Sequence, residues 1–309
     1  MIVAADAAGA IPAGLTDRAV QVVRAGLAAA IAVASDQGLP TAGPRVLSCR
    51  GNLIVHLVPA PVVARVATLT GWTRADPYRW LAREVAVAGH LAKRGGPVVA
   101  PASRADPGPH RSHGLAVSLW DYVPPSEQRP RPEETGEALA QLHLAAADFP
   151  GQLPDMSPAR ELISEGLAAL EREHVITQQE LAALQGRHSS VLVELATGNR
   201  SAGVLHGDAH PRNLIKIGAD WGWIDLEESC RGPLNWDLAV LTCYSRGGQR
   251  ALAAYGAATG MPTPDRQDLA PFTRARELEV TVWMLAMAHM YPARYRGQAQ
   301  RRMAALVCS

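Results

Sequence analysis

The 309-residue chain has only four cysteines, almost no net charge and no long uninterrupted apolar run. Cys49, Cys230, Cys243 and Cys308 lack the close spacing of metal-binding cysteines, so we expect free thiols. The formal net charge of +1 gives no electrostatic reason to expect a nucleic acid or a membrane surface as a partner. Because no apolar run approaches the ~18 residues that span a bilayer, we also expect no membrane-spanning segment.

The N-terminal stretch, residues 1–15, is rich in alanine but contains Asp6 and lacks a basic start, so we expect no secretory signal peptide. Apolar residues make up 48% of the chain and charged residues 19%, which is a globular balance. The length exceeds the ~150 residues of a typical domain, so two lobes are expected. Together these properties predict a soluble, cytoplasmic protein.

One stretch of the sequence carries a dense set of polar residues at fixed spacing. The loop His206-Gly-Asp-Ala-His-Pro-Arg-Asn213 is followed by an apolar run, a turn at 218–220 and a second run that ends at Asp225. A hairpin of this kind brings Asp225 back to the loop that carries Asp208. One carboxylate can then accept the proton of a hydroxyl group, while Asn213 and Asp225 supply the oxygen ligands that Mg²⁺ prefers. A polar surface turn is the alternative reading, and the combined spacing argues against it.

HGDAHPRN together with IDLEE resembles the catalytic and metal loops of the aminoglycoside phosphotransferase and choline kinase superfamily, which shares the protein-kinase-like fold. Residues 232–239 resemble the stretch that follows in those enzymes, where an aspartate at a helix start steadies the catalytic loop. The resemblance is sharp over residues 200–242, and weaker but ordered over residues 45–145. It implies an α+β, two-lobed fold with an N-terminal antiparallel sheet plus helix and a larger, mostly helical C-terminal lobe.

The hydrophobic patterns predict the same order of elements. A helix is expected over 15–34, with Thr16 as its N-cap. Strands follow at 46–49, 53–58 and 62–68, then a helix at 78–93 and strands at 98–100 and 115–122. The proline-rich segment 124–132 divides the chain into a nucleotide-binding lobe (1–123) and a catalytic and substrate-binding lobe (124–309). In the second lobe, helices are expected at 133–147, 158–174, 177–196, 235–244 and 274–291, besides the hairpins of the catalytic region.

The resemblance assigns roles to the residues of the loop. Asp208 is the expected catalytic base, because a loose phosphoryl-transfer transition state needs a positioned carboxylate more than a strong base. His206 is expected to bond backbone near the metal loop, a structural role that we favour over direct chemistry. Asp237 is expected to brace the catalytic loop through backbone N–H groups.

Asn213 and Asp225 are the expected magnesium ligands. Glu227 stands two residues beyond Asp225, where some relatives place an acidic group that helps the metal or its waters, and this role stays open here. Glu228 is either structural or part of an acidic rim around the substrate.

The nucleotide side departs from the family pattern. Arg65 occupies the third strand at the place where the family carries a phosphate-gripping lysine, and its expected partner is Glu84 on the next helix. Arginine also binds phosphate, with a longer two-pronged group, although an exposed arginine and glutamate are the alternative. Trp120, Tyr122 and Val123 are the expected hinge, where backbone groups read the purine edge and so leave ATP and GTP unseparated. The first hairpin, at 49–52, lacks a GxGxxG sequence.

These observations predict an ATP- or GTP-dependent phosphotransferase that uses Mg²⁺ and acts on a hydroxyl of a small molecule. The short stretch between Asp225 and Trp236 leaves no room for a peptide-docking segment. The resemblance favours an antibiotic or aminosugar-like natural product over choline, since the sequence shows no evident aromatic box for a quaternary ammonium. The alternative is a catalytically weak, pseudokinase-like nucleotide-binding protein, suggested by Arg65 and the missing glycine-rich loop. The sequence makes no prediction about the oligomeric state.

Overall fold

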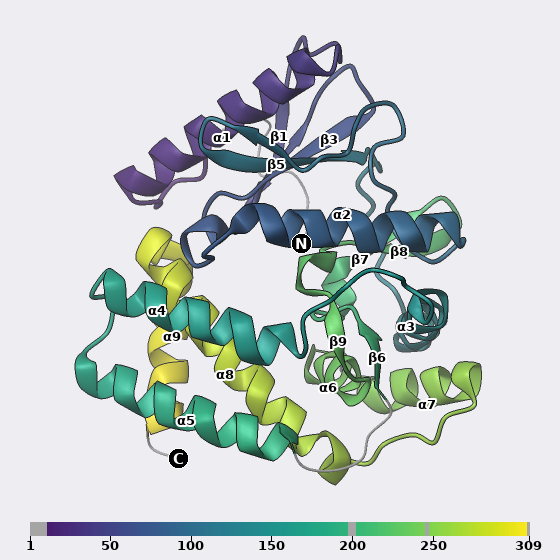
Figure 1. Ribbon diagram of the computed structural model, residues 1–309, viewed down its shortest axis with the longest axis vertical. Helices are drawn as coiled ribbons and strands as arrows, with labels where there is room; N and C mark the ends of the chain where they lie inside the picture. The colour runs from purple at the N-terminus through teal and green to yellow at the C-terminus, as the bar shows by residue number, and fades with distance from the viewer. Residues whose placement is uncertain (1–10, 197–201, 245–246, 308–309) are drawn as a thin grey trace.

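The structure, a computed structural model, describes residues 11–196, 202–244 and 247–307. Its N-terminal part is a five-stranded antiparallel sheet with the strand order β1-β2-β3-β5-β4 (Figure 1). The strands are β1 (Arg45–Cys49), β2 (Leu53–His56), β3 (Val62–Val66), β4 (His110–Ser112) and β5 (Leu115–Asp121). Two helices accompany the sheet, α1 (Asp17–Asp36) and α2 (Pro77–Lys93). This is the predicted sheet-plus-helix arrangement.

The helix α1 packs on the sheet through its small residues. Its N-cap is Thr16, as predicted, and Gly26 lies against Leu53 and Val66 of the sheet. By length and composition alone, α1 is the one described helix that could cross a membrane, which the sequence analysis did not expect. In the fold its buried side faces strands β2 to β5, so the same apolar residues form part of the sheet's core.

The helix α2 begins at Pro77, after Asp76 accepts the N–H of Tyr78. Its polar side chains bond residues that lie far along the chain. Arg83 donates to Ser157 Oγ at 2.9 Å and to Glu161 Oε2 at 3.1 Å. The helix therefore contacts the sheet and the helical part of the molecule together.

The prediction of a strand at 98–100 is wrong. This segment forms single bridges only, Val98 with Trp223 and Pro101 with Trp120. The N–H of Val99 donates to Trp223 O at 3.0 Å, while Ala100 O accepts the N–H of Asp121 at 3.1 Å. Proline on either side removes the donors that a longer ladder needs. The fifth strand is instead β4, which lies in the segment expected to be a loop.

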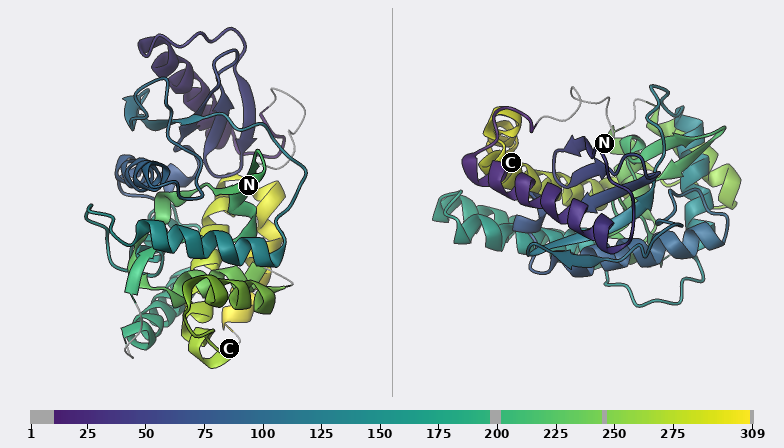
Figure 2. Two further views of the ribbon diagram at one scale, coloured as in Figure 1. Left: turned by 90° about the vertical axis from the view of Figure 1, so that its right-hand side faces the viewer. Right: turned by 90° about the horizontal axis from the view of Figure 1, so that it is seen from above.

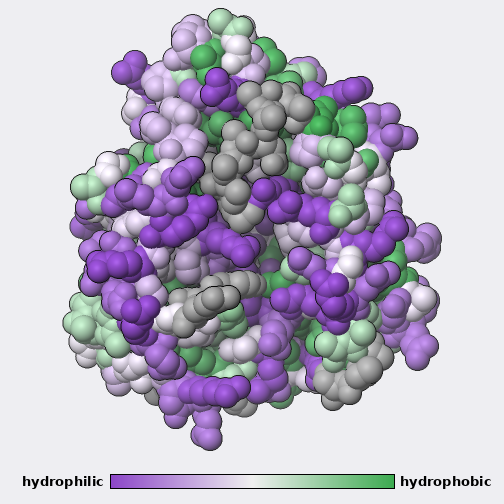
Figure 3. All heavy atoms as spheres, turned by 180° about the vertical axis from the view of Figure 1, so that it is seen from behind, coloured by the Kyte–Doolittle hydropathy of each residue, from purple (hydrophilic) through white to green (hydrophobic). Residues whose placement is uncertain are grey.

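The larger part of the molecule is mostly helical, as predicted. The connection 122–131 runs along the outside of this part to its first helix, α3 (Figure 2). Its helices are α3 (Pro132–Ala146), a π-helical turn (Pro158–Leu162) leading into α4 (Ile163–Arg172), α5 (Gln178–Ala196), α6 (Asn235–Tyr244), α7 (Gly248–Thr259), α8 (Arg266–Met290) and α9 (Pro292–Val307). The prediction missed α7 and α9. It also began α8 too late, because Pro271 lies inside that helix. Hydrophilic residues gather across the middle of the face opposite to that of Figure 1 (Figure 3).

Two small two-stranded sheets, of which only β7–β8 is a hairpin, flank the polar loop. Strand β6 (Ala202–Leu205) pairs with β9 (Cys230–Pro233), and β7 (Leu214–Ile217) pairs with β8 (Asp220–Trp223). The β7–β8 register places Leu214 opposite Trp223. The ends of this hairpin, Asn213 and Asp225, are therefore neighbours, as the sequence predicts.

Candidate active site

A buried carboxylate fixes the loop that joins β6 to β7. Asp237, near the start of α6, has no exposed surface. It accepts the backbone N–H of His206 at 2.7 Å and that of Gly207 at 3.0 Å. His143 of α3 lies 3.0 Å from the same carboxylate through Nε2. Asp237 thus makes the bracing contacts expected of it.

His206 joins the loop to β8. Its Nε2 lies 3.1 Å from Ile224 O, and its Nδ1 lies 3.2 Å from the backbone N of Asp208. Burial lowers the pKa of His206, in spite of nearby Asp237 and Asp208. A neutral ring that donates from Nε2 to the carbonyl and accepts the N–H at Nδ1 satisfies both contacts. These are the backbone contacts of a structural residue.

Gly207 lets the loop lie close to the segment after β8. Its φ is +91°, and an added Cβ would come 2.4 Å from Glu228 O, so no other residue fits without movement. Asp225 also has a left-handed backbone, with φ 69° and ψ 48°. Such a conformation is uncommon for a residue other than glycine and is often found at functional sites.

Asp208 is held from two sides. Asn213 Nδ2 donates to Asp208 Oδ2 at 2.9 Å, and Arg276 of α8 donates to Oδ1. Burial by itself raises the pKa of the Asp208 carboxyl, but the Arg276 guanidinium, with help from His210 and His206, holds this pKa below its ordinary value. Asp208 is therefore ionised near neutral pH, which is the state of a hydroxyl-proton acceptor.

The oxygen donors beside Asp208 suit a magnesium ion. The amide nitrogen of Asn213 is directed at Asp208, which leaves its oxygen as the atom that can face a cation. Asp225 uses Oδ1 toward Arg65 and so can offer Oδ2. No group of three or more His, Cys, Asp or Glu that could hold a metal occurs within residues 11–196, 202–244 and 247–307. Two protein ligands suffice for Mg²⁺ where substrate phosphates and water supply the rest.

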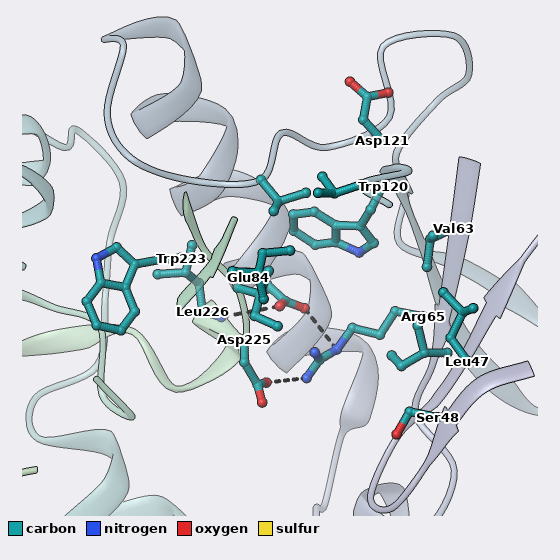
Figure 4. Close-up of a pocket in the computed structure, with 15 residues that line it drawn as sticks. Leu47, Ser48, Val63, Arg65, Glu84, Trp120, Asp121, Trp223, Asp225 and Leu226 are labelled. Carbon is teal, nitrogen blue, oxygen red and sulfur yellow. Dashed lines mark hydrogen bonds and ion pairs between the residues drawn. The ribbon is translucent and has the colours of Figure 1, made fainter. Parts of the chain in front are cut away.

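Arg65 and Glu84 form the predicted pair, and each of them also contacts the segment after β8 (Figure 4). The side chain of Arg65 lies 3.2 Å from Glu84 through Nε and 2.5 Å from Asp225 through Nη2. Glu84 also accepts the N–H of Leu226 at 3.2 Å. Burial raises the pKa of Glu84 to about 8, against the pull of Arg65. Arg65 is only 8% exposed, which rules out the alternative of a surface arginine.

Glu227 lies between two guanidinium groups. Its Oε1 is 3.0 Å from Arg65 Nη2, and its Oε2 is 2.5 Å from Arg74 Nη1. Burial raises the pKa of Glu227, but Arg65 and Arg74 outweigh burial and lower it. Arg74 in turn stacks on Trp80, 4.2 Å from the ring centroid. In this arrangement Glu227 orients the arginines, and a metal would compete with both of them for its oxygens.

A cavity that we call the apolar cavity lies between the sheet and the β7–β8 hairpin (Figure 4). Apolar side chains from both sides line it, among them Leu47, Val63, Trp120, Val123, Ile215 and Ile224. Arg65, Glu84 and Asp225 close one end. Its shape and lining suit a flat, weakly polar ring such as a purine.

The three predicted hinge residues do not all line this cavity. Trp120 and Val123 line it, but Tyr122 is not among the described residues that do. The Tyr122 N–H donates to Pro61 O at 3.0 Å, and its ring stacks on His56 with a centroid distance of 3.7 Å. Val123 is therefore the better candidate for a backbone contact with a purine edge.

A second cavity, of about 500 Å³, lies on the other side of Arg65 and Asp225, and we call it the charged cavity. Its walls carry the carboxylates Asp208, Asp225, Glu227, Glu228 and Glu279, with several arginines. Burial and the neighbouring Glu279 and Asp208 raise the pKa of Glu228, while burial raises that of Glu279 to about 7. Glu228 Oε2 is buried with no hydrogen-bond partner in the part of the chain that the structure describes. Three buried carboxyl groups and three buried guanidinium groups therefore share this wall, namely Glu227, Glu228 and Glu279 with Arg65, Arg74 and Arg276.

Three residues of the site were missed by the sequence analysis, namely Arg74, His143 and Arg276. Each is a single residue on an element remote in sequence, with no motif around it. The i, i+3 spacing of Arg276 and Glu279 on α8 is the one local signal, and it is shared by many exposed helices.

Comparisons with known proteins agree with this geometry. The Phosphotransferase enzyme family (APH) matches residues 52–272. Among curated relatives, a homoserine kinase of Parvibaculum lavamentivorans is 29% identical over 189 residues, which cover 57% of this chain and 52% of that protein. A homoserine kinase of Methylocella silvestris is 34% identical over 136 residues, 40% of each protein. The chain thus spans about half the length, or less, of these relatives.

Solved structures share the fold at low sequence identity. An amicoumacin kinase bound to AMP-PNP and Ca²⁺ has a TM-score of 0.64 at 10% identity, covering 85% of this chain and 87% of that one. A choline/ethanolamine kinase family protein from Mesorhizobium loti gives 0.60 at 19%, covering 92% and 94%. An aminoglycoside phosphotransferase from Streptomyces rimosus, in complex with ADP and streptomycin, gives 0.55 at 18%, covering 82% and 98%.

The fold is therefore that of the two-lobed, protein-kinase-like small-molecule kinases, as predicted. Since the family match covers well over half of the chain, the protein belongs to the phosphotransferase enzyme family.

Proposed function

We propose that this protein transfers the terminal phosphoryl group of ATP or GTP to a hydroxyl group of a small molecule. The observation that carries the proposal is the convergence of Asp208, Asn213 and Asp225 on the charged cavity, with Asp225 and Arg65 shared between both cavities. A nucleotide base in the apolar cavity then places its phosphates at Arg65. The acceptor hydroxyl approaches the same point from the charged cavity.

In the proposed reaction the hydroxyl oxygen bonds the γ-phosphorus, and the bond from that phosphorus to the bridging oxygen of the leaving diphosphate breaks. Asp208 takes the proton of the hydroxyl group. Asn213 and Asp225 would hold Mg²⁺, which supplies positive charge against the phosphates when it is bound. His206 and Asp237 hold the loop, and the Val123 N–H meets the purine edge.

We further propose an antibiotic or aminosugar-like natural product as the acceptor. The charged cavity, at about 500 Å³, lies within the size range of small-molecule sites. Glu228 of this cavity has a buried oxygen, Oε2, with no hydrogen-bond partner among the described residues, and an amino group of the acceptor could donate to it. Among the described lining residues only Trp283 and Tyr295 are aromatic, and they pack edge to face at 5.3 Å, which is no cage for a quaternary ammonium.

The division into lobes at 123/124 is also a proposal. It is supported by the connection 122–131, which leads from the sheet to the helical part. Localisation in the cytoplasm stays a prediction.

A panel of acceptors tests the function. The protein is incubated with Mg²⁺ and ATP or GTP and with L-homoserine, ethanolamine, choline, streptomycin or another aminoglycoside, and products are read by the mass gain of one phosphate. We expect a product from at least one aminosugar, and none from the Asp208→Asn variant. Phosphorylation of homoserine alone would move the acceptor to the amino acids. Tight nucleotide binding without any product would favour the pseudokinase-like alternative, which the contact of Arg65 with Asp225 also motivates.

A further inference from the structure

Arg276 reaches the site from α8 and lies 68 residues beyond Asp208 in the chain. Its side chain is 6% exposed, and its two terminal nitrogens are divided between Asp208 Oδ1 and Glu279 Oε2. The helix α8 packs against α4, α5, α6 and α9, so the base of this side chain is fixed by the core. Both terminal nitrogens of the guanidinium are thus held by carboxylates.

The carboxylate of Asp208 needs such a partner. The torsion about the bond from Cβ to the carboxyl group of an aspartate is broad, with no steep minimum of its own. Asn213 fixes one oxygen, Oδ2, at 2.9 Å. His210 Nε2 lies 3.5 Å from the same oxygen, so both of these contacts act on Oδ2 and leave the carboxylate able to turn about it. A second donor on the other oxygen, from Arg276, fixes the plane.

The carboxylate keeps room for a substrate. An ionised carboxylate offers about four lone-pair sites. Asn213 and Arg276 occupy one site on each oxygen, and His210 Nε2 lies 3.5 Å from Oδ2, so Oδ1 keeps an open site. A hydroxyl group in the charged cavity can therefore still donate to Asp208 while both contacts persist. The two contacts decide which direction the remaining sites face.

We propose that Arg276 is a positioning residue for the transfer reaction: its guanidinium fixes the plane of the Asp208 carboxylate so that the carboxylate meets the acceptor hydroxyl. The role rests on the proposed function. Geometric errors of about 1 Å at a reacting group cost on the order of 100-fold in rate, so we expect a loss of about that size in kcat when the guanidinium is removed.

Four variants, of which Arg276→Ala serves for chemical rescue, test the role with the acceptor that the wild-type protein phosphorylates in the panel. Arg276→Met keeps the length of the side chain without its donors, and Arg276→Lys restores one charged group without the fork. Arg274→Met is the matched control, because Arg274 lies on the same helix, is half exposed and pairs with Glu194 at 2.7 Å. We measure kcat, both KM values, the affinity for AMP-PNP with Mg²⁺ by calorimetry, and Tm.

The expected result is a split between turnover and nucleotide binding. Arg276→Met should lose about 100-fold in kcat and keep its AMP-PNP affinity, because Arg276 does not line the apolar cavity. Arg276→Lys should recover part of the loss, and Arg274→Met should match the wild type. In Arg276→Ala, guanidinium chloride far below denaturing concentrations should restore turnover.

An active wild type beside an equally active Arg276→Met would overturn this role and leave the proposed function standing. A rise in kcat would overturn it too, since the contact would then block Asp208. So would a joint fall of kcat, AMP-PNP affinity and Tm that guanidinium does not reverse, which marks a structural arginine. A wild type that phosphorylates no acceptor overturns the proposed function and this role with it.

Discussion

The bracing carboxylate Asp237 gives the sharpest quantitative prediction. In the wild type it accepts the backbone N–H groups of His206 and Gly207 at 2.7 and 3.0 Å, in a place that water does not reach. Replacing Asp237 with alanine leaves both N–H groups buried without an acceptor. Each such group costs about 1–3 kcal/mol, so Asp237→Ala should lower the free energy of unfolding by about 2–6 kcal/mol. A domain has only about 5–15 kcal/mol in total.

Urea unfolding, followed by circular dichroism, measures this loss. Asp237→Asn keeps one acceptor oxygen, so it should lose roughly half as much. Asp220→Ala is the control, because Asp220 is an exposed aspartate at the start of β8. The control should stay within about 0.5 kcal/mol of the wild type, as surface substitutions usually do. If Asp237→Ala unfolds at the same urea concentration as the control, the carboxylate does not brace the loop.

Four further predictions concern the charged residues of the site. Asp208→Ala should lose at least ~100-fold in turnover, the usual contribution of a positioned base, with little change in nucleotide affinity. Asp225→Asn should raise the Mg²⁺ concentration required for half-maximal turnover, because an anionic ligand is lost. Arg65→Ala should weaken nucleotide binding measured by calorimetry, and Arg65→Lys should recover only part of it. Glu279→Gln should flatten the pH dependence of stability. The folded-state pKa of Glu279 is raised to about 7, whereas the unfolded value is about 4.3. The stability contributed by the protonated Glu279 is therefore full below the unfolded value and is lost as the pH rises through 7.

Each of these has an outcome that contradicts it. Near wild-type turnover in Asp208→Ala would remove this carboxylate from the reaction. A nucleotide complex with its metal held by other side chains would contradict the assignment of Asp225. Unchanged nucleotide kinetics in Arg65→Ala would leave the chain without a phosphate clamp. For Glu279→Gln, unfolding free energies at about pH 5 and 8 must differ less than in the wild type and in Glu277→Gln, an exposed control on the same helix.

The sequence predicted the parts of the site that local spacing determines. His206, Asp208 and Asn213 share one tight loop, and a hairpin of known length returns Asp225 to it, so their meeting needs no knowledge of the rest of the fold. The pair of Arg65 and Glu84 followed from the family resemblance together with the order of strand and helix. These are contacts whose geometry is fixed by elements next to each other in the chain.

Other contacts depend on how distant elements pack, and the sequence does not encode them locally. Arg276 meets Asp208 only because of the way α8 packs among the other helices. Arg74 meets Glu227 only because of the path of the turn before α2. The segment at 98–100 was read as a strand from its valines. In the structure Val99 donates to β8 and Ala100 accepts from β5. Hydropathy does not show that such a segment divides its hydrogen bonds between two strands.

The position of α2 has a consequence for motion. By sequence α2 belongs to the N-terminal part, yet Arg83 bonds Ser157 and Glu161, and Glu84 holds the N–H of Leu226. The same helix also packs against β5, so it is held from both sides. A rotation of the sheet against the helical part would therefore strain the ion pairs of Arg65 with Asp225 and Glu227, which lie outside the sheet. Under the proposed function, opening for nucleotide exchange would then also displace the guanidinium proposed to hold the phosphates.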